Sequence, residues 1–448
     1  MAFNKKTVRD VNLTGKRVLL GADYNVPVEA GKITDDYRLR ASLPTIKYIL
    51  DQRPAGLIII SHLGRPAGHP EPAFSLRPVA RHLTQLLGHD VHFAEDCIGL
   101  AAHTAAAQLR PDQILMLENL RFHAEEEKND PRFAKALVEA TAAEVLVADG
   151  FGVVHRAHAS TVAITKLLPA VAGLLLAREV EVITALRKKP LRPLVAVLGG
   201  AKIADKIELL EQMIELADTV AVAGAMANNF LVAEGLKVGK SVVDHGMIAE
   251  TKHILAKARC AERERNFNFI IPVDAVVSTD IDGGRPTRVV DLTSHSLADI
   301  EAYPKLPPAS ASNVHADELI LDIGPISAGT IVGAVKLAEA VIWNGSCGVT
   351  ETKGMAGAAA PFAHASRLVA EAMMGASLHH RNRPFTFVGG GDTVGYVEAE
   401  GWTEDFSHVS TGGGASLELL TGHKLPGVEA LESRNDVQSK RKRIKVDG

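Results

Sequence analysis

The chain has 448 residues and is 46% hydrophobic and 23% charged, a balance typical of folded globular proteins and not of disordered ones. This length predicts two domains of about 200 residues each. The formal net charge of −4 gives no overall attraction to nucleic acid or to anionic membranes. Three cysteines are too few and too scattered for a disulfide framework or a zinc site, so we expect a reducing, cytoplasmic compartment.

The two ends of the chain carry no expected membrane or secretion signal. The N-terminal sequence MAFNKKTVRDVNLTGKR is charged and lacks the apolar segment of a signal peptide. The most apolar stretches, such as residues 219–235, are interrupted by polar side chains, so no membrane span is predicted. The C-terminal sequence SKRKRIKV is expected to lie in a solvated tail, with a nucleic-acid or targeting patch as the alternative.

Short apolar runs alternate along the chain with segments whose apolar residues recur at helical spacing. Runs that are apolar at consecutive positions are typical of parallel strands buried on both faces. The predicted strands are Arg17–Leu20, Gly56–Ile60, Gln113–Leu117, Val145–Val147, Pro193–Leu198, Thr219–Ala223, Phe269–Pro272, Leu319–Asp322, Ala340–Trp343 and Phe385–Val388. Segments such as Leu76–Leu87 and Asp205–Ala217 are predicted helices. The alternation predicts an α/β fold with parallel sheets.

This alternation occurs twice, which predicts two Rossmann-like domains. One set of strands ends near Val147 and the next begins near Pro193. The sequence between them predicts one long interdomain helix, Val171–Lys189, stopped by prolines that cannot continue a helix. We therefore expect an N-terminal domain over residues 1–170, the helix over 171–189 and a C-terminal domain over 190–409.

In the first half, cationic and hydrogen-bonding residues follow the predicted strands, where ligands bind in open α/β sheets. These residues are Asp23, Asn25, Arg38, His62, Arg65, Arg121 and Arg156. Guanidinium groups bind phosphate and carboxylate in bidentate fashion, so the group predicts a site for a small polyanion. Taken singly, each arginine could be a surface ion pair, and Glu125–Glu127 is expected to be a solvated acidic run. His155 and His158 could suggest a metal, but no third ligand is adjacent in sequence.

In the second half, glycines follow the predicted strands instead. The clusters are Gly199-Gly200-Ala201-Lys202, Ala223-Gly224-Ala225, Asn344-Gly345-Ser346-Cys347-Gly348, Gly389-Gly390-Gly391-Asp392-Thr393 and Thr411-Gly412-Gly413-Gly414. Glycine at a strand–helix junction lets backbone N–H groups approach phosphate oxygens, although close helix packing explains a single pair equally well. Neither the Walker A nor the GxGxxG spacing is present. Asp392 suits Mg²⁺ held between a carboxylate and nucleotide phosphates, or it caps a helix.

An anion site and a nucleotide site on two domains predict phosphoryl transfer after the domains close about the helix. Positive charge and N–H donors at the transferring group would supply most of the catalysis. No general base stands among the glycines. A carboxylate or ADP phosphate nucleophile needs none, because it is already ionised at neutral pH.

At this point the sequence resembles the phosphoglycerate kinase family. The motifs DYNVP, SHLGRP, ENLRF, FGxxHRAH, LGGAKxxDK, WNGxxG, GGGDT and STGGGAS occur in the family's order and spacing, over roughly residues 7–430. The resemblance implies a monomeric enzyme that moves a phosphoryl group between 1,3-bisphosphoglycerate and ADP, in glycolysis, gluconeogenesis or carbon fixation. It also implies that 3-phosphoglycerate binds the first domain and Mg-nucleotide the second. A further implication is that residues 410–430 return to the first domain, leaving 431–448 as the tail.

The resemblance also assigns roles to single residues. It implies that Asp23, Asn25, Arg38, His62, Arg65, Arg121 and Arg156 hold the phosphoglycerate, with Arg38 also facing the transferring group. Lys202 and the amides of Gly412, Gly413 and Gly414 would stabilise that group, and Asp392 would carry Mg²⁺. The implied nucleotide ligands are Gly200, Ala201, Lys206, Gly224, Asn344, Gly348, Glu351, Gly390, Gly391, Asp392 and Thr393, with Glu351 on the ribose.

The chain departs from the common family pattern at several positions beside these motifs. They are Gly21, Ala148, Val153, Ala223, Ser346 and Thr350. None of them removes an implied ligand side chain, so we expect effects on nucleotide affinity or closure more than on the reaction. Two alternatives remain: a kinase-like paralogue without turnover that binds metabolites, and a dinucleotide enzyme, which the missing GxGxxG disfavours.

Overall fold

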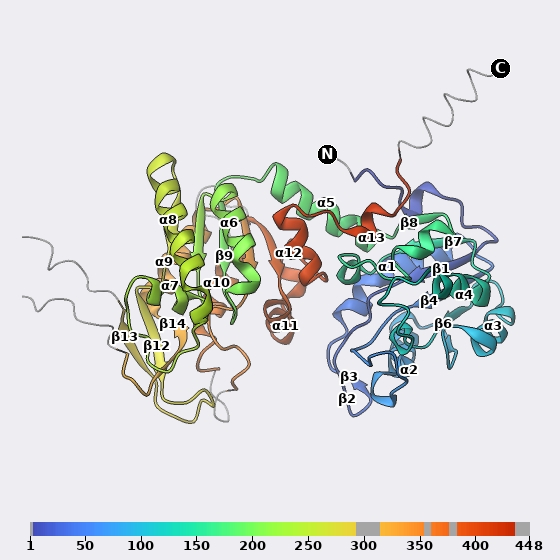
Figure 1. The fold of residues 1–448 in the computed structure, drawn as a ribbon, viewed down its shortest axis with the longest axis horizontal. Coiled ribbons are helices and arrows are strands. Elements are labelled where there is room, and N and C mark those ends of the chain that lie inside the picture. The colour runs from blue at the N-terminus through green and yellow to red at the C-terminus, as the bar shows by residue number, and fades with distance from the viewer. Residues whose placement is uncertain (1–2, 293–313, 354–359, 376–382, 435–448) are drawn as a thin grey trace, which may run out of the picture. The chain divides into compact units, whose positions relative to one another are not determined.

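A computed structural model describes residues 3–292, 314–353, 360–375 and 383–434. The chain divides into two compact units, which are described separately (Figure 1). The first contains Met1–Ala185 and the chain from Thr411 onward, and the second contains Leu186–Ser410. The SKRKRIKV sequence of the expected tail lies outside the described residues. Among the described residues, no helix has the length and apolar character needed to cross a membrane.

The first unit is built on a six-stranded parallel sheet with the order β5-β6-β4-β1-β7-β8. Its strands are β1 (Arg17–Gly21), β4 (Gly56–Ile60), β5 (Val91–Phe93), β6 (Ile114–Met116), β7 (Val145–Ala148) and β8 (Ala170–Ala172). The predicted strands of this half are therefore present, while β5 and β8 were missed. The sequence of β5 is Val-His-Phe and is not fully buried, and β8 lies directly before the apolar start of a helix, so neither gave a separate apolar run.

The helices of the first unit are α1 (Tyr37–Asp51), α2 (Arg77–Leu87), α3 (Gly99–Ala107), α4 (Pro131–Thr141), α12 (Gly414–Thr421) and α13 (Pro426–Glu429). A short hairpin, β2 (Val28–Glu29) and β3 (Lys32–Ile33), precedes α1. Helix α2 buries Val79 and Leu83 and ends at Gly88, whose φ of 64° closes the last turn. One core cluster joins the faces of α1 and α2 to the sheet residues, including Leu20, Ile59 and Met116.

The last described residues complete the first unit. The N–H of Glu432 donates to the carbonyl of Ala170 in β8 at 3.0 Å, and Lys6 N–H donates to the Glu432 carbonyl at 2.7 Å. Figure 1 accordingly shows α13 next to β8. Residues from both ends of the chain therefore pair with the same strand region.

The long helix begins later than the sequence predicted. Helix α5 spans Leu174–Lys188, and the predicted first residue, Val171, lies in strand β8. The apolar run at 170–172 continues into the helix without a break, so periodicity alone could not separate them. Asp149 fixes the start, because its Oδ1 accepts the N–H groups of Leu175 at 3.0 Å and Leu176 at 3.2 Å.

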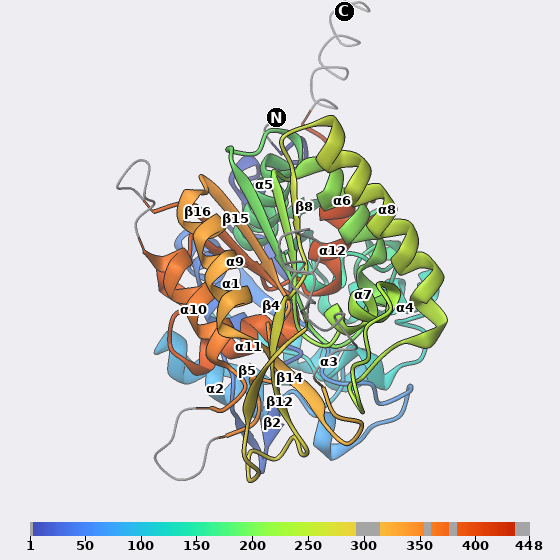
Figure 2. The ribbon, with the colours of Figure 1, turned by 90° about the vertical axis from the view of Figure 1, so that its left-hand side faces the viewer.

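The second unit contains a six-stranded parallel sheet with the order β11-β10-β9-β15-β16-β17. Its strands are β9 (Leu194–Leu198), β10 (Thr219–Val222), β11 (Asn268–Ile270), β15 (Ala340–Asn344), β16 (Phe385–Gly389) and β17 (His408–Val409). Its helices are α6 (Ile207–Leu216), α7 (Ala227–Ala233), α8 (Ile248–Glu264), α9 (Pro325–Leu337), α10 (His364–Met374) and α11 (Gly391–Ala399). Figure 2 shows α6 and α8 on one face of this sheet and α9 and α10 on the other.

One predicted strand lies in a different sheet. The segment Leu319–Asp322 forms most of β14 (Leu319–Ile323), which belongs to a three-stranded antiparallel sheet with β12 (Asp274–Ser278) and β13 (Arg288–Asp291). A short run of three apolar residues followed by an aspartate does not reveal the direction of its partner strand, so the parallel assignment was wrong here. The α/β architecture with parallel sheets is otherwise confirmed.

Candidate functional site

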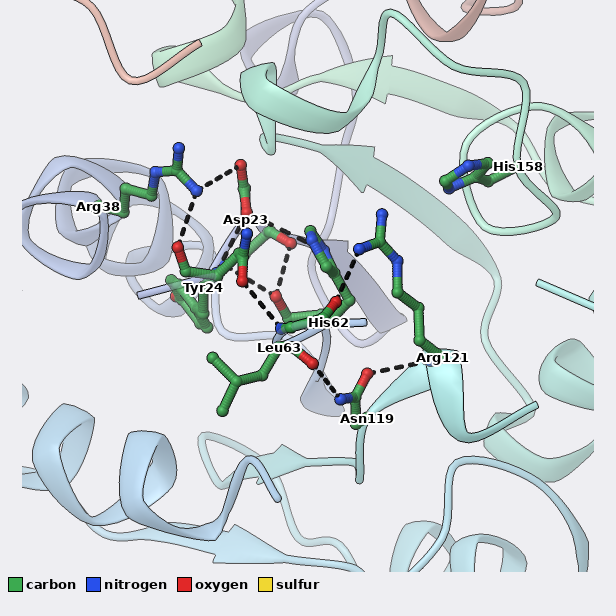
Figure 3. A network of polar contacts seen from close by, with 12 residues as sticks. Asp23, Tyr24, Arg38, His62, Leu63, Asn119, Arg121 and His158 are labelled. Carbon is green, nitrogen blue, oxygen red and sulfur yellow. Dashed lines mark hydrogen bonds and ion pairs between the residues drawn. The ribbon is translucent and has the colours of Figure 1, made fainter. Parts of the chain in front are cut away.

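The first unit carries a polar network where β1 and β4 end (Figure 3). The backbone after β1 is fixed by Ser61, whose hydroxyl accepts the Tyr24 N–H at 2.8 Å and donates to the Ala22 carbonyl at 2.9 Å. This holds Asp23 with its side chain 7% exposed and 3.2 Å from Nη1 of Arg38. The same Nη1 donates to the Asn25 carbonyl at 2.9 Å, so Arg38 is tied to both ends of this short segment.

The segment after β4 joins the same network. His62 Nδ1 lies 4.0 Å from Oδ1 of Asp23, and the Gly64 N–H donates to Oδ1 of Asn25 at 2.9 Å. Arg121 donates from Nη1 to the Gly64 carbonyl at 2.8 Å. The structure therefore brings five of the seven predicted anion ligands into one connected group, four from the segments after β1, β4 and β6 and Arg38 from the start of α1.

Arg121 is positioned by a buried asparagine that sequence reasoning did not single out. Asn119 is fully buried, donates to the carbonyls of Leu63 and Phe74, and accepts the Arg121 N–H at 3.0 Å. Its position two residues before Arg121 in the ENLRF motif was the available signal. Its satisfied hydrogen bonds make it a positioning residue and not a ligand.

The other two predicted anion ligands, Arg65 and Arg156, are exposed. Arg65 follows Gly64 directly in the network. Burial lowers the pKa of Arg121, Glu127 acts in the opposite direction, and the positive charge of Arg156 lowers it further, so the two arginines are close enough to interact. Both guanidinium groups are thus placed where solvent or a ligand can reach them, unlike the buried Arg121.

Burial keeps the histidines of this region neutral. Desolvation lowers the pKa of His62 to about 4, against the opposing attraction of Asp23. Desolvation and the charge of Arg121 lower the pKa of His158 to about 4. Neutral imidazoles donate or accept hydrogen bonds without adding charge. The positive potential here therefore comes from arginines.

Glu126 was expected in a solvated acidic run, and this was wrong. The residue is 3% exposed, its carboxylate accepts the Ser160 N–H and hydroxyl, and His158 Nδ1 lies 3.8 Å away. Burial raises the pKa of Glu126 to about 7. Glu125 and Glu127 on either side are exposed, as expected, so the middle residue alone is buried, which a count of neighbouring charges could not reveal.

The glycine turn 412–414 belongs to the first unit. Thr411 donates from its N–H at 2.7 Å and its hydroxyl at 2.8 Å to Oε1 of Glu179, a fully buried carboxylate in α5. A Cβ on Gly412 would collide with the Phe151 ring, and a Cβ on Gly152 would collide with the Asp23 carboxylate. The turn therefore packs next to the polar network, and it opens α12 with its first N–H groups.

In the second unit, the strand ends form a close backbone packing. The Gly200 N–H donates to the Ser346 carbonyl at 2.9 Å, and the Gly224 N–H donates to the Cys347 carbonyl at 2.9 Å. A Cβ on Gly224 would lie 2.6 Å from the Gly200 nitrogen, closer than any side chain tolerates. The segments that follow β9, β10 and β15 are therefore packed against one another through their backbones.

The side chain of Lys206 stabilises this packing. Its Nζ donates to the carbonyls of Gly199 at 2.7 Å and Asn344 at 2.8 Å. Burial lowers the pKa of Lys206 to about 8, with the carboxylate of Asp392 acting in the opposite direction. Two of its three donors are used by the protein, which leaves one for a ligand.

Next to this packing lies a cavity of about 110 Å³. Six predicted nucleotide ligands line it: Gly200, Ala201, Gly224, Gly348, Glu351 and Asp392. Its remaining wall includes apolar side chains, among them Leu231, Pro272 and Leu292. Asn228, which the sequence did not single out, also lines the cavity. Its fully buried Oδ1 has no hydrogen-bond partner, while its Nδ2 donates to the Val242 carbonyl.

The remaining predicted residues of this half lie around the cavity and do not line it. Lys202 is exposed, and Gly390 and Gly391 form the start of α11. Thr393 accepts the Gly345 N–H at 2.6 Å. Asn344 is fully buried, and neither polar atom of its side chain has a hydrogen-bond partner. Because buried polar groups in native proteins are normally hydrogen-bonded, the Asn344 amide is expected to bond to a water or a ligand.

A buried carboxylate missed by sequence reasoning closes the cavity wall. Asp322 accepts the Ala365 N–H at 3.0 Å at the start of α10, and burial raises its pKa to about 7. A Cβ on residue 348 would collide with the Asp322 carboxylate, so the buried acid requires a glycine at this position.

One unit thus carries arginines gathered for a small anion, and the other carries glycine junctions at a cavity whose lining includes the carboxylate of Asp392. This combination defines the class of two-substrate phosphotransferases with α/β domains. The family model described as "Phosphoglycerate kinase" matches residues 8–423. The chain belongs to the phosphoglycerate kinase family, and it is therefore a phosphotransferase with a carboxyl group as acceptor.

Individual relatives agree over nearly the whole chain. "Phosphoglycerate kinase" of Moorella thermoacetica is 42% identical over 430 residues, covering 96% of this chain and 100% of the relative. That of Chloroflexus aurantiacus is 43% identical over 433 residues, covering 96% and 99%. The solved phosphoglycerate kinase structure from Coxiella burnetii has a TM-score of 0.75 and 34% identity, covering 95% of this chain and 98% of that one. The one from Pyrococcus horikoshii has a TM-score of 0.77 and 29% identity over the same shares.

Proposed function

We propose that this chain catalyses the reversible transfer of a phosphoryl group from 1,3-bisphosphoglycerate to ADP, giving 3-phosphoglycerate and ATP. The proposal rests on the different groups that the two units present. The first has arginines and neutral histidines, and the second has glycine junctions around a cavity. In the transfer, the bond from phosphorus to the carboxyl oxygen breaks and a bond to the terminal oxygen of ADP forms. Both oxygens are anionic at neutral pH, so no proton needs to move.

The phosphoglycerate is assigned to the first unit. Arg121 and Arg38 are held by backbone carbonyls and Asp23, so their guanidinium groups are ordered before a ligand arrives. Asp23, Asn25, His62, Arg65 and Arg156 complete the proposed ligand set. Pre-ordered, partly desolvated guanidinium groups bind an anion with little further loss of side-chain entropy.

The nucleotide is assigned to the second unit. The apolar wall of the cavity suits a base, and the buried Oδ1 of Asn228 suits a donor on it. The exposed Lys202, the third donor of Lys206 and the N–H groups at the starts of α7 and α11 suit the phosphates.

The carboxylate of Asp392 fits a magnesium ion that travels with the nucleotide. It is exposed, lies in the first turn of α11 and lines the cavity. Mg²⁺ prefers oxygen ligands and one or two carboxylates together with phosphates. When bound, the ion neutralises charge on the phosphate oxygens, and the protein's share is to hold it by Asp392.

We also propose the two domains expected from the sequence, with residues 1–170 and 410–430 in the first and 190–409 in the second. The helix between them would bend when the domains close. The 3-phosphoglycerate complex and the nucleotide complex would each favour closure only weakly, and both ligands together more strongly, because only then do contacts span the domains. The three free cysteines suit a reducing cytoplasm, where we propose that the chain acts as a monomer.

The decisive experiment measures turnover by the purified full chain. Acyl phosphate should form from 3-phosphoglycerate only when ATP and Mg²⁺ are both present, as followed by phosphorus NMR. Omission of 3-phosphoglycerate controls for simple ATP hydrolysis. Tight binding of both substrates by calorimetry without any turnover would instead establish the metabolite-binding paralogue, a function that no comparison supports.

A further inference from the structure

A mixed group of three side chains lies outside the proposed substrate sites. Asp96 and Cys97 stand on the loop after β5, and His123 follows the 3₁₀ turn Leu120–Phe122. One ligand atom from each, a carboxylate oxygen, a sulfur and a ring nitrogen, lie within 4.8 Å of one another. Among the described residues, this is the group of three whose ligand atoms converge in this way.

The donors match one class of metal. Thiolate, imidazole and carboxylate are the ligands of Zn²⁺ and chemically similar divalent ions, whereas Mg²⁺ takes oxygen ligands only. Three protein ligands leave a fourth tetrahedral position for water. The burial suits this arrangement, because Cys97 is fully buried while the His123 and Asp96 side chains are 26% and 44% exposed. The sulfur would close the inner side, and solvent reaches the outer side.

The group is held in place by its surroundings. Oδ1 of Asp96 accepts the Cys97 N–H at 2.7 Å, and it lies 2.8 Å from Nε2 of His123. The His123 ring packs against Phe133 with 5.3 Å between ring centroids. A metal would replace the direct contact between Asp96 and His123, so binding requires local adjustment and no new fold.

Local charge also favours a cation. The carboxylate of Asp96 is one of the three converging groups, and its negative charge attracts a divalent cation. On binding, the thiol proton leaves to solvent and the sulfur–metal bond forms, with no change in oxidation state.

An Asp96–His123 ion pair and an Asp96 turn account for part of this geometry. They do not account for the sulfur of Cys97 turned toward the same point. The cysteine count, which argued against a zinc site at the sequence level, overlooked this group because a single sulfur is joined by a histidine 26 residues away. We propose that Asp96, Cys97 and His123 form a binding site for a zinc-class divalent cation in the first unit.

The test uses Co²⁺ as a spectroscopic probe on the full chain, stripped of metal and kept reduced without added thiols. The wild type should bind one Co²⁺ per chain with a near-ultraviolet thiolate-to-cobalt absorption band, and Zn²⁺ should displace it. Cys97→Ala should abolish the band, and His123→Asn should weaken Zn²⁺ binding at least tenfold by calorimetry. Cys260→Ala removes an exposed thiol in the second unit and should change neither.

A band that survives in Cys97→Ala, or that disappears in Cys260→Ala, would overturn the site. So would an absence of the band in the wild type. His123→Asn and Asp96→Asn alter partly exposed side chains and serve as the deciding variants if Cys97→Ala does not fold. Undiminished Zn²⁺ affinity in both of them would equally refute the proposal.

Discussion

The two units organise their proposed ligands in opposite ways. In the first, side chains hold one another: Arg38 bonds to Asp23 and the Asn25 carbonyl, and Arg121 bonds to the Gly64 carbonyl. In the second, the backbone forms the shape, and contacts run between Gly200, Gly224 and the chain after β15. The first site recognises a ligand by charge placed in advance. The second makes room for one by omitting side chains.

This difference separates the kinds of substitution that each site should tolerate. Truncating a charged side chain removes a ligand in the first unit. Adding a single methyl group at a glycine obstructs the second. Lys202 is the exception, since it is an exposed side chain in a site built mainly from backbone.

Lys202→Ala should lower kcat by a factor on the order of 10²–10³ and leave binding of each substrate nearly intact. A charge that acts mainly on the transferring group contributes chiefly in the transition state. Steady-state kinetics with calorimetric binding would measure this. The matched control, Lys240→Ala, removes another exposed lysine of the same unit and should be silent. An unchanged kcat would remove Lys202 from the mechanism.

Arg121→Ala should raise KM for 3-phosphoglycerate roughly tenfold to a hundredfold, because hydrogen bonds to charged groups are worth about 1.5–3 kcal/mol. It should also lower Tm, since its bond to the Gly64 carbonyl is lost. Arg65→Ala should raise the same KM without the loss of stability, because Arg65 is exposed. KM for ATP should stay within about twofold for both. Equal effects on the two substrates would undo the assignment of ligands to units.

Gly224→Ala should weaken ATP binding by about 1–3 kcal/mol through backbone strain and contact with Gly200. Gly235→Ala is the matched control, because Gly235 also has positive φ (91°) but open space around it. The control should cost stability alone, measured as Tm, and leave ATP affinity unchanged. Should both variants lose ATP affinity equally, contact at the strand junctions would not matter for the nucleotide.

His62→Gln should change how stability depends on pH. The pKa of His62 is about 4 in the folded chain and about 6.5 when unfolded, so the unfolded state binds more protons between these values. The wild type should therefore lose about 1–3 kcal/mol of unfolding free energy, relative to the variant, as pH falls from 6.5 to 4. Urea titrations at several pH values would show this. His69→Gln, at an exposed histidine, should follow the wild type.

The sequence predicted the parts of the fold whose pattern is set by burial on both faces. Strands such as β4 and β9 are apolar at every position because each is fully buried, and both were predicted to within one residue. Strand β5 is only partly buried and contains His92, and β8 lies directly before the apolar start of α5, so neither gave such a signal, whereas the equally short but fully buried β6 did. The antiparallel sheet of β12, β13 and β14 depends on which strand pairs with which, and a local pattern contains no such information.

The candidate site was predictable in its residue types more than in its geometry. The motif positions Asp23, Arg38 and Arg121 do converge, but their roles toward a ligand remain predictions, as do the domain boundaries. Buried groups such as Glu126 and Asp322 were missed, because their burial comes from residues distant in sequence. Asn228 was missed because an amide in an apolar helix carries no distinguishing spacing.

The order of the chain has a consequence for how the protein is made. The second unit is inserted into the first, whose last piece begins only at Thr411. On the ribosome, residues 1–185 therefore emerge without their partners for Val154, Ala170 and Lys6, which come from Gly427 and Glu432. At about 5–20 residues per second the wait lasts on the order of tens of seconds, during which the second unit can fold completely. The unit translated first is then the one completed last.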